Sequence, residues 1–382
     1  MQSASGMGVL KRNGLRGVGI GAGYFSAYHY DAWMRIPRVE ISAIADLDLR
    51  KAERTAARFS ISRVYADYEE MLAKERPDFV DIITPPGAHL AICSAAAARG
   101  VNIICQKPLT PTFAEAQQLV EVMEGSGVRF LVHENWRWQP WYREIRSMID
   151  EGVLGDVFSA HFAMRLGDGW REDAYLARQP YFRDYPRLLM FETGVHFIDL
   201  FRFLLGEVTS VYARLRRLNS QIRGEDSGHV VLGFASGATA VLDANRYNEP
   251  ETDADPRYTF GTLRLDGARG HVRLHPDGRL MVKPLGKSAR EHTYERPVRG
   301  FAGDSTHRIQ SHFVERLTSG APFESEGRDY LLTLRVVEAC YTSSAEGRVV
   351  HLDRRGAEKD DASGGATAAD GVIARADQWA IS

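Results

Sequence analysis

The sequence predicts an α/β protein in which a parallel, doubly wound sheet is followed by a large, mostly antiparallel open sheet. Three observations predict this fold class. Short apolar strands alternate with helices over residues 14–134, which is typical of parallel sheets with right-handed crossovers. Longer segments of alternating polarity follow over residues 135–353, which is typical of antiparallel strands. The first apolar strand also ends in a glycine-rich turn.

This turn lies in residues 16–26, RGVGIGAGYFS, which form a pattern of buried strand, turn and helix start. A glycine at position 21 permits a tight turn, and one at position 23 lets the backbone approach a pyrophosphate at the helix N-terminus. The third small position of the Rossmann pattern is a serine. The alternative is a glycine-rich turn before any buried helix. The residues expected at the cofactor are Gly21, Gly23, Tyr24, Phe25 and Ser26.

An acidic residue ends the next predicted strand, residues 39–46. Asp46 lies 23 residues after Gly23, near the spacing of the carboxylate that accepts the ribose hydroxyls of NAD. The alternative role is a turn residue or a helix N-cap. Because a carboxylate repels a 2′-phosphate, Asp46 favours NAD over NADP, although Arg50 nearby offsets part of that repulsion.

The rest of the first region repeats the alternation of strand and helix. Helices are expected at 49–59, 68–74, 89–99 and 113–124, and strands at 63–65, 78–83, 101–105 and 129–133. Ligands of parallel sheets bind at the carboxyl ends of the strands. Asp46, Thr84 and Lys107 all occupy such ends.

The second region changes character after about residue 150. Strands are expected at 157–165, 208–218, 229–235, 238–246, 257–265 and 349–352, and helices at 189–205, 306–318 and 328–347. The tail 354–382 is rich in Ala, Gly and Asp, and we expect most of it to be disordered.

The composition excludes several classes of partner. With 48 Lys plus Arg against 50 Asp plus Glu, the net charge of −2 provides no general attraction to nucleic acid or to an acidic membrane. The three cysteines are far apart and have no metal-ligand spacing, so we predict a reducing compartment and no metal. Residues 1–13 lack a hydrophobic run, and no stretch is apolar enough to span a membrane. A cytoplasmic protein is expected.

Two segments carry residues suited to acid–base chemistry. Lys107 ends a buried strand, and Glu192, His196 and Asp199 stand at i, i+4 and i+7, which share one face of a regular helix. The alternatives are an exposed strand-end lysine and a polar helix face with one satisfied histidine. A zinc motif would need a second histidine at this spacing, and none is present.

Five of these motifs in this order resemble the Gfo/Idh/MocA oxidoreductase family over residues 14–353. They are the glycine turn, Asp46, Thr84-Pro85-Pro86, Lys107-Pro108 and Gly194-x-His196-x-x-Asp199. The resemblance implies a Rossmann domain at 14–134, a substrate and oligomerisation domain at 135–353, and a homodimer or homotetramer. Further NAD contacts are expected at Thr84, Pro85, His89, Gln106 and Lys107. Two positions depart from the family, since Gln106 replaces a glutamate and Glu192 an aspartate.

The resemblance gives the polar residues chemical roles in oxidising an alcohol. His196 is the expected base, because the unperturbed pKa of histidine lies near neutrality. Lys107 is expected to contact substrate and nicotinamide and to stabilise partial negative charge on the reacting oxygen. We expect Glu192 to orient or charge-stabilise His196.

Two further stretches are expected to line a substrate site. Residues 133–140, HENWRWQP, contain both amide side chains and aromatic rings, which suit a sugar. The alternative is an aromatic junction between the two domains, which would have the same sequence pattern. Residues 167–183 form a long loop rich in Arg and aromatics, and such loops are often functional. The expected substrate contacts are Lys107, Asn135, Trp136, Asp168, Gln179, Glu192, His196 and Asp199.

These observations favour an NAD-dependent dehydrogenase of a sugar or polyol. The two stretches, together with Gln106, also resemble sugar dehydrogenases that act on branched pentoses such as D-apiose. Two alternatives belong to other classes of protein. A glycosidase of the same fold would oxidise its substrate transiently and release no NADH, and a dinucleotide-binding sensor would need neither Lys107 nor His196.

Overall fold

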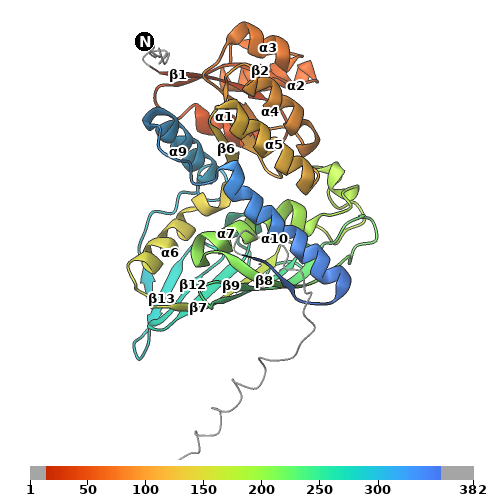
Figure 1. The fold of residues 1–382 in the computed structure, drawn as a ribbon. Coiled ribbons are helices and arrows are strands. Elements are labelled where there is room, and N and C mark those ends of the chain that lie inside the picture. The colour runs from red at the N-terminus through yellow and green to blue at the C-terminus, as the bar shows by residue number, and fades with distance from the viewer. Residues whose placement is uncertain (1–13, 354–382) are drawn as a thin grey trace, which may run out of the picture.

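The computed structural model describes residues 14–353, so the expectations for residues 1–13 and for the tail 354–382 lie outside the described residues. The described chain forms a six-stranded sheet and a nine-stranded sheet, which build two lobes (Figure 1). Among the described residues, no helix has the length and apolar character needed to cross a membrane.

The first sheet is parallel throughout, in the order β3-β2-β1-β4-β5-β6. This is the strand order of a Rossmann fold, and it confirms the predicted class. The strands are β1 (Leu15–Ile20), β2 (Val39–Ala45), β3 (Arg63–Tyr65), β4 (Phe79–Ile82), β5 (Asn102–Gln106) and β6 (Phe130–His133). The helices of this part are α1 (Ser26–Trp33), α2 (Leu49–Phe59), α3 (Tyr68–Glu75), α4 (His89–Ala97) and α5 (Phe113–Ser126).

The second sheet has the order β14-β13-β12-β11-β7-β10-β9-β8-β15. Its strands are β7 (Val157–Arg165), β8 (Val208–Arg216), β9 (Ser227–Phe234), β10 (Thr239–Asn245), β11 (Thr262–Gly267), β12 (Gly270–Leu274), β13 (Leu280–Pro284), β14 (Arg290–His292) and β15 (Val350–His351). All pairs are antiparallel except β7 with β10, so the sheet is mixed but largely antiparallel as predicted.

The strand expected at 257–265 begins later than predicted. Residues Pro256–Thr259 instead form a short helix, α8. The Asp255 side chain caps it by accepting a hydrogen bond from the Arg257 backbone N–H at 2.9 Å, and Pro256 suits the first helical position.

The helix expected at 189–205 is interrupted near its start. Residues Leu189–Gly194 form a π-helical turn, η4, and the regular helix α7 is Val195–Leu205. The Glu225 carboxylate accepts hydrogen bonds from the backbone N–H groups of Leu188 and Met190, at 3.2 and 3.0 Å. π-Helical turns are frequent at functional sites, and this one alters the angle between Glu192 and His196.

Helices α6 (Pro140–Asp150), α7 and α10 (Gly327–Glu346) lie between the second sheet and the first lobe (Figure 1). Helix α9 (Ser305–Ser319) instead packs with α1 on the first sheet. The Phe313 ring lies 5.4 Å from that of Phe79 and 6.3 Å from that of Trp33. Arg35 anchors the start of α9 through an ion pair with Asp304 at 2.6 Å. The core of the first lobe therefore includes a segment from near the end of the chain.

Candidate active site

A cavity of about 280 Å³ opens between the two lobes, where strands β4 and β5 end. Thirteen residues expected at the cofactor or the substrate line it: Gly23, Tyr24, Phe25, Thr84, Pro85, Gln106, Lys107, Asn135, Trp136, Asp168, Gln179, Glu192 and His196. Five other expected residues lie outside its lining: Gly21, Ser26, Asp46, His89 and Asp199.

The glycine turn has the backbone geometry that a phosphate-binding turn needs. Gly21 has φ +115°, and a Cβ there would lie 2.6 Å from the Ile83 carbonyl oxygen. A Cβ on Gly23 would meet nothing within 4 Å, so the backbone there borders open space at the start of α1. Ser26 is buried, and its hydroxyl donates to the Gly23 carbonyl oxygen at 2.7 Å. The turn therefore fits a pyrophosphate group.

Asp46 extends from the end of β2 to the same turn. Its carboxylate accepts hydrogen bonds from the backbone N–H groups of Ala22 and Asp48, at 2.7 and 2.9 Å. The side chain therefore has a fixed position beside the glycine turn, where the ribose of a dinucleotide is expected.

His89 does not face the cavity, which corrects the expectation that it contacts the cofactor. Its ring is buried, with Nδ1 2.9 Å from the Leu109 carbonyl oxygen and Nε2 2.8 Å from that of Thr84. Burial lowers the pKa of this imidazole. His89 thus connects, through its two ring nitrogens, the loop that contains Thr84 and the loop that follows Lys107.

Gln106 reaches the cavity from within a buried polar cluster. Its Nε2 lies 2.7 Å from His29 Nε2 and 3.1 Å from His133 Nδ1, and its Oε1 accepts the Lys107 backbone N–H. Asp81 binds the other side of His29, at 2.7 Å from Nδ1. An amide can donate to both imidazoles while accepting from the backbone. A glutamate, the residue common in the family, has no hydrogen atoms to donate there when ionised.

Lys107 pairs with Glu192 across the cavity. The Lys107 ammonium donates to the Glu192 carboxylate at 2.8 Å and to its main-chain carbonyl oxygen at 2.7 Å. Burial raises the pKa of Glu192, but Lys107 and Arg246 outweigh this effect and lower it to about 2. The hydrogen-bond partner of Glu192 is therefore the lysine and not His196. The charge of Glu192 still raises the pKa of His196 in part, so its charge-stabilising role stays a prediction.

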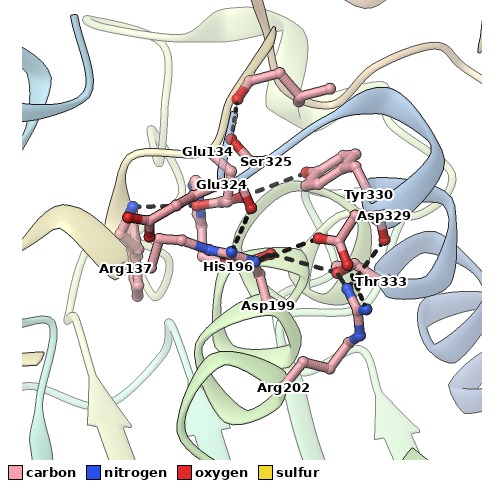
Figure 2. Close-up of polar contacts among 12 residues, drawn as sticks. Glu134, Arg137, His196, Asp199, Arg202, Glu324, Ser325, Asp329, Tyr330 and Thr333 are labelled. Atoms are coloured by element: carbon pink, nitrogen blue, oxygen red, sulfur yellow. Dashed lines mark hydrogen bonds and ion pairs between the residues drawn. The ribbon is translucent and has the colours of Figure 1, made fainter. Parts of the chain in front are cut away.

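His196 has a different carboxylate partner, Glu134, which directly follows β6. The His196 Nδ1 atom lies 2.5 Å from Glu134 Oε1 (Figure 2). The Trp136 indole stacks on the imidazole at 4.4 Å, with an angle of 3° between the planes. One face of Trp136 is therefore covered by His196 and is not free to hold a sugar. Burial, followed by the charge of Lys107, lowers the pKa of His196 well below its ordinary value.

Asp199 lies behind the site, which corrects the expectation that it contacts the substrate. It is fully buried and binds the Arg137 guanidinium through two hydrogen bonds, at 2.8 and 2.5 Å (Figure 2). Burial raises its pKa, and Arg137 opposes that rise. Asp199 is thus part of the ionic network that also holds Arg202.

The far wall of the cavity comes from the long loop and from β10. Asp168 binds the buried Arg246 through two hydrogen bonds, at 3.1 and 2.6 Å, and lies 3.3 Å from Arg178. The Gln179 amide donates to the Tyr181 hydroxyl at 3.0 Å. Sequence reasoning missed Arg246, and it included Glu134 in the stretch 133–140 without giving it a role of its own. The available signal was their position, because each lies immediately after the end of a strand, as Lys107 does.

The fold and the site together define a class of protein. The glycine turn of a Rossmann sheet, which suits a phosphate group, borders the cavity that a lysine and a histidine also line. This is the arrangement of a nicotinamide-dependent oxidoreductase. Residues 15–134 match the oxidoreductase family with an NAD-binding Rossmann fold, and residues 142–273 match the GFO/IDH/MocA C-terminal domain. The chain belongs to the Gfo/Idh/MocA oxidoreductase family.

Named relatives extend the match over most of the chain. It is 36% identical to the D-apiose dehydrogenase of Paraburkholderia graminis, across 90% of this chain and 91% of that protein. It is 33% identical to the D-apiose dehydrogenase of Rhizobium rhizogenes, across 88% and 97%. An oxidoreductase from Agrobacterium radiobacter, solved in complex with NAD⁺, L-tartaric acid and magnesium, superposes with a TM-score of 0.82 at 31% identity, across 88% and 98%.

Proposed function

We propose that this protein is an NAD-dependent dehydrogenase that oxidises a hydroxyl group of a neutral sugar or polyol, with a branched aldopentose such as D-apiose as the first candidate. The observation that carries the proposal is the convergence of Gly23, Lys107 and His196 on one cavity. Two D-apiose dehydrogenases among the relatives support the choice of sugar. The proposal assigns cofactor binding to residues 14–134 and substrate binding to residues 135–353.

The residues present fit NAD. The open space at Gly23 and the N–H groups at the start of α1 suit the pyrophosphate, and the fixed carboxylate of Asp46 suits the ribose hydroxyls. Arg178 and Arg257 also line the cavity, and Arg178 lies 5.5 Å from the centre of the Tyr24 ring beside the turn. Bound NAD⁺ supplies the acceptor for the hydride of the substrate carbon.

Lys107 and His196 handle the hydroxyl group. The Lys107 ammonium donates to the reacting oxygen and stabilises the negative charge that develops there. His196 accepts the hydroxyl proton, because its Nδ1 is held by Glu134 and its Nε2 is left for the cavity. The lowered pKa of His196 keeps this base unprotonated at neutral pH.

The charges of the cavity favour a neutral substrate. Each acid in the lining already has a basic partner, since Glu192 pairs with Lys107 at 2.8 Å and Asp168 with Arg246 at 2.6 Å. The other cations of the lining also have acidic partners, since Arg178 lies 3.3 Å from Asp168 and Arg257 lies 3.3 Å from Asp255. Arg178 also lies beside Tyr24 on the side of the glycine turn, where the cofactor supplies negative charge. Hydroxyl groups can hydrogen-bond to these paired acids and bases without adding net charge.

A panel of aldoses, ketoses and polyols, screened with NAD⁺ for the absorbance of NADH, tests the proposal. D-apiose and closely related pentoses are expected to give the highest kcat/KM, and His196→Asn is expected to abolish most of it. Hydrolysis of a glycoside without net NADH would instead favour the glycosidase. Binding of NAD⁺ with no turnover of any panel member would favour a sensor.

We also infer a homodimer or homotetramer that uses the open face of the second sheet. Tyr212, Val231 and Val241 form a cross-strand row there, and the first two are more than a third exposed. Exposed apolar rows of this kind mark interaction surfaces. Light scattering of Val231→Lys against wild type tests this inference. The three buried, unpaired cysteines support a reducing compartment such as the cytoplasm.

A further inference from the structure

Glu134 holds the Nδ1 atom of His196 and is fully buried directly behind it. Its Oε1 lies 2.5 Å from His196 Nδ1 and accepts the Trp136 backbone N–H at 3.2 Å. Its Oε2 lies 3.4 Å from the Tyr330 hydroxyl (Figure 2). Burying a carboxylate is costly unless its charge is compensated. Such a group in contact with the base calls for an explanation.

The neighbouring arginine does not provide that compensation through a hydrogen bond. The Arg137 guanidinium instead donates hydrogen bonds to Asp199 and to the Glu324 carbonyl oxygen, and it lies 3.7 Å from Asp329. Figure 2 shows this ionic network beside the pair formed by Glu134 and His196. The imidazole is therefore the closest titratable partner of the Glu134 carboxylate.

We propose that Glu134 is a positioning residue of the dehydrogenase reaction, which fixes the Nδ1–H tautomer of His196 and stabilises the imidazolium that forms during turnover. The inference rests on the proposed function. An ionised carboxylate only accepts hydrogen bonds, so the ring nitrogen that faces it must carry the hydrogen. Nε2 is then the free base. Trp136, stacked on the ring, fixes its plane.

The proton balance of the step explains why a carboxylate is needed. As the substrate O–H bond breaks, an N–H bond forms at Nε2, and the ring gains a positive charge between Lys107 and Glu134. The Lys107 ammonium disfavours that charge, and the Glu134 carboxylate offsets it. In the same way, the acid of a hydrolase triad orients the histidine and stabilises the imidazolium, while the histidine takes the proton.

Several charged and titratable groups surround the pair and set its pH response. Those facing Glu134 or His196 are Lys107, His133, Arg137, Glu192, Asp199 and Tyr330. Burial raises the pKa of Glu134 to about 7, although Lys107 lowers it in part. The pair therefore takes up a proton near neutral pH, and that uptake weakens the base.

The first test is the pH profile of Glu134→Gln. Wild-type kcat/KM is expected to rise with pH and level off above about pH 7. The variant should lose about 10²–10⁴-fold in kcat, the range typical of acid–base groups, while its Kd for NAD⁺ stays the same. Its acidic limb should move to lower pH, because the titration of Glu134 is removed while burial and Lys107, which outweigh the charges of Glu192 and Asp199, still lower the pKa of His196. An unmoved limb with kcat within threefold of wild type would overturn the inference.

Two further variants separate positioning from simple packing. Glu134→Asp keeps the charge and should retain the acidic limb with a partial loss of kcat. Tyr330→Phe removes a hydrogen-bond donor to the Glu134 carboxylate, so the acidic limb of the pH profile of this variant should move to higher pH. An acidic limb that stays in place counts against the inference. Glu124→Gln is the matched control, because Glu124 pairs with Arg328 at the surface and should leave the profile unchanged.

The second test does not depend on turnover. The imidazole ¹⁵N shifts of His196, assigned among 12 histidines by comparison with His196→Asn, report which ring nitrogen carries the hydrogen. Protonated Nδ1 and bare Nε2 are expected in wild type, and a mixture of tautomers in Glu134→Gln. A bare Nδ1 in wild type would overturn the inference even if the sugar screen succeeds. Failure of that screen with the expected tautomer would overturn only the proposed function.

Discussion

Lys107 and Glu192 form an ion pair between the end of β5 and the π-helical turn, with 2.8 Å between Nζ and Oε1. The lysine also binds the main-chain carbonyl oxygen of Glu192, at 2.7 Å. Two contacts to one residue fix the position of the ammonium at the cavity wall. The pair joins the two lobes, so the reacting groups are held by partners that lie 85 residues apart in the chain.

Removing the lysine should harm turnover far more than cofactor binding. Lys107→Ala is expected to lower kcat by about 10²–10³-fold, the usual loss when one donor to a developing oxyanion is removed. The Kd for NAD⁺ should change little. Steady-state kinetics and calorimetry measure the two effects, with Lys74→Ala as a surface control. Folded Lys107→Ala with near-wild-type kcat would contradict the assigned role.

The lysine and the histidine should act as a unit. His196→Asn removes the titratable base and keeps a polar side chain, so kcat should fall by about 10²–10⁴-fold. The double variant with Lys107→Ala should lose less than the product of the two single losses, because groups that act together in one step are not additive. Fully multiplicative losses would mean that the two residues act on different steps.

Asp46 should control the preference between cofactors. Asp46→Asn can still accept the Ala22 N–H but removes the charge that repels a 2′-phosphate. We expect a higher KM for NAD⁺, a lower KM for NADP⁺ and an unchanged melting temperature. A wild-type preference for NADP⁺ would show that Asp46 has been assigned the wrong role.

Asp199 should affect stability rather than substrate binding. Asp199→Asn removes the charge that binds the buried Arg137 guanidinium directly and leaves only the more distant Asp329, and breaking a buried pair costs about 3–5 kcal/mol. Chemical denaturation should show the loss, while KM for the sugar stays close to wild type. A raised KM with unchanged stability would restore the expectation that Asp199 contacts the substrate.

The raised pKa of Glu134 predicts how stability depends on pH. Its carboxyl ionises near pH 4.5 in the unfolded chain and near 7 in the folded protein, so wild-type stability falls as pH rises across that window. Glu134→Gln lacks this titration. Its melting temperature relative to wild type should therefore increase between pH 4.5 and 7. A constant difference between the two proteins would contradict the raised pKa.

The strand ends were the most informative feature of the sequence. Apolar strands that stop at Asp46, Thr84 or Lys107 predict a parallel sheet and place these residues along one edge, because carboxyl ends of parallel strands share an edge. The same reasoning applied to β6 would have singled out Glu134. The cofactor and substrate roles given to the lining residues stay predictions, since they concern molecules that bind there.

The helix of the site was harder to predict. The spacing of Glu192, His196 and Asp199 places them on one face only if the helix is regular, and the π-helical turn breaks that regularity. Their partners are also distant, because Glu134 and Arg137 each lie 62 residues before the group that they bind. Periodicity within one segment contains no information about such contacts. His89 was misassigned for the same reason.

Helix α9 has a consequence for how the protein can be divided. Phe313 covers Trp33 and Phe79, so a fragment that ends at residue 134 would contain all six strands of the first sheet and still leave these rings uncovered. The segments that run between the lobes are also bound to one another, through Asn135 with Ser305 at 2.8 Å and Val132 with Ser325 at 3.0 Å. The smallest autonomous cofactor-binding unit is therefore discontinuous in sequence, and swapping this lobe between relatives requires two exchanged segments rather than one cut.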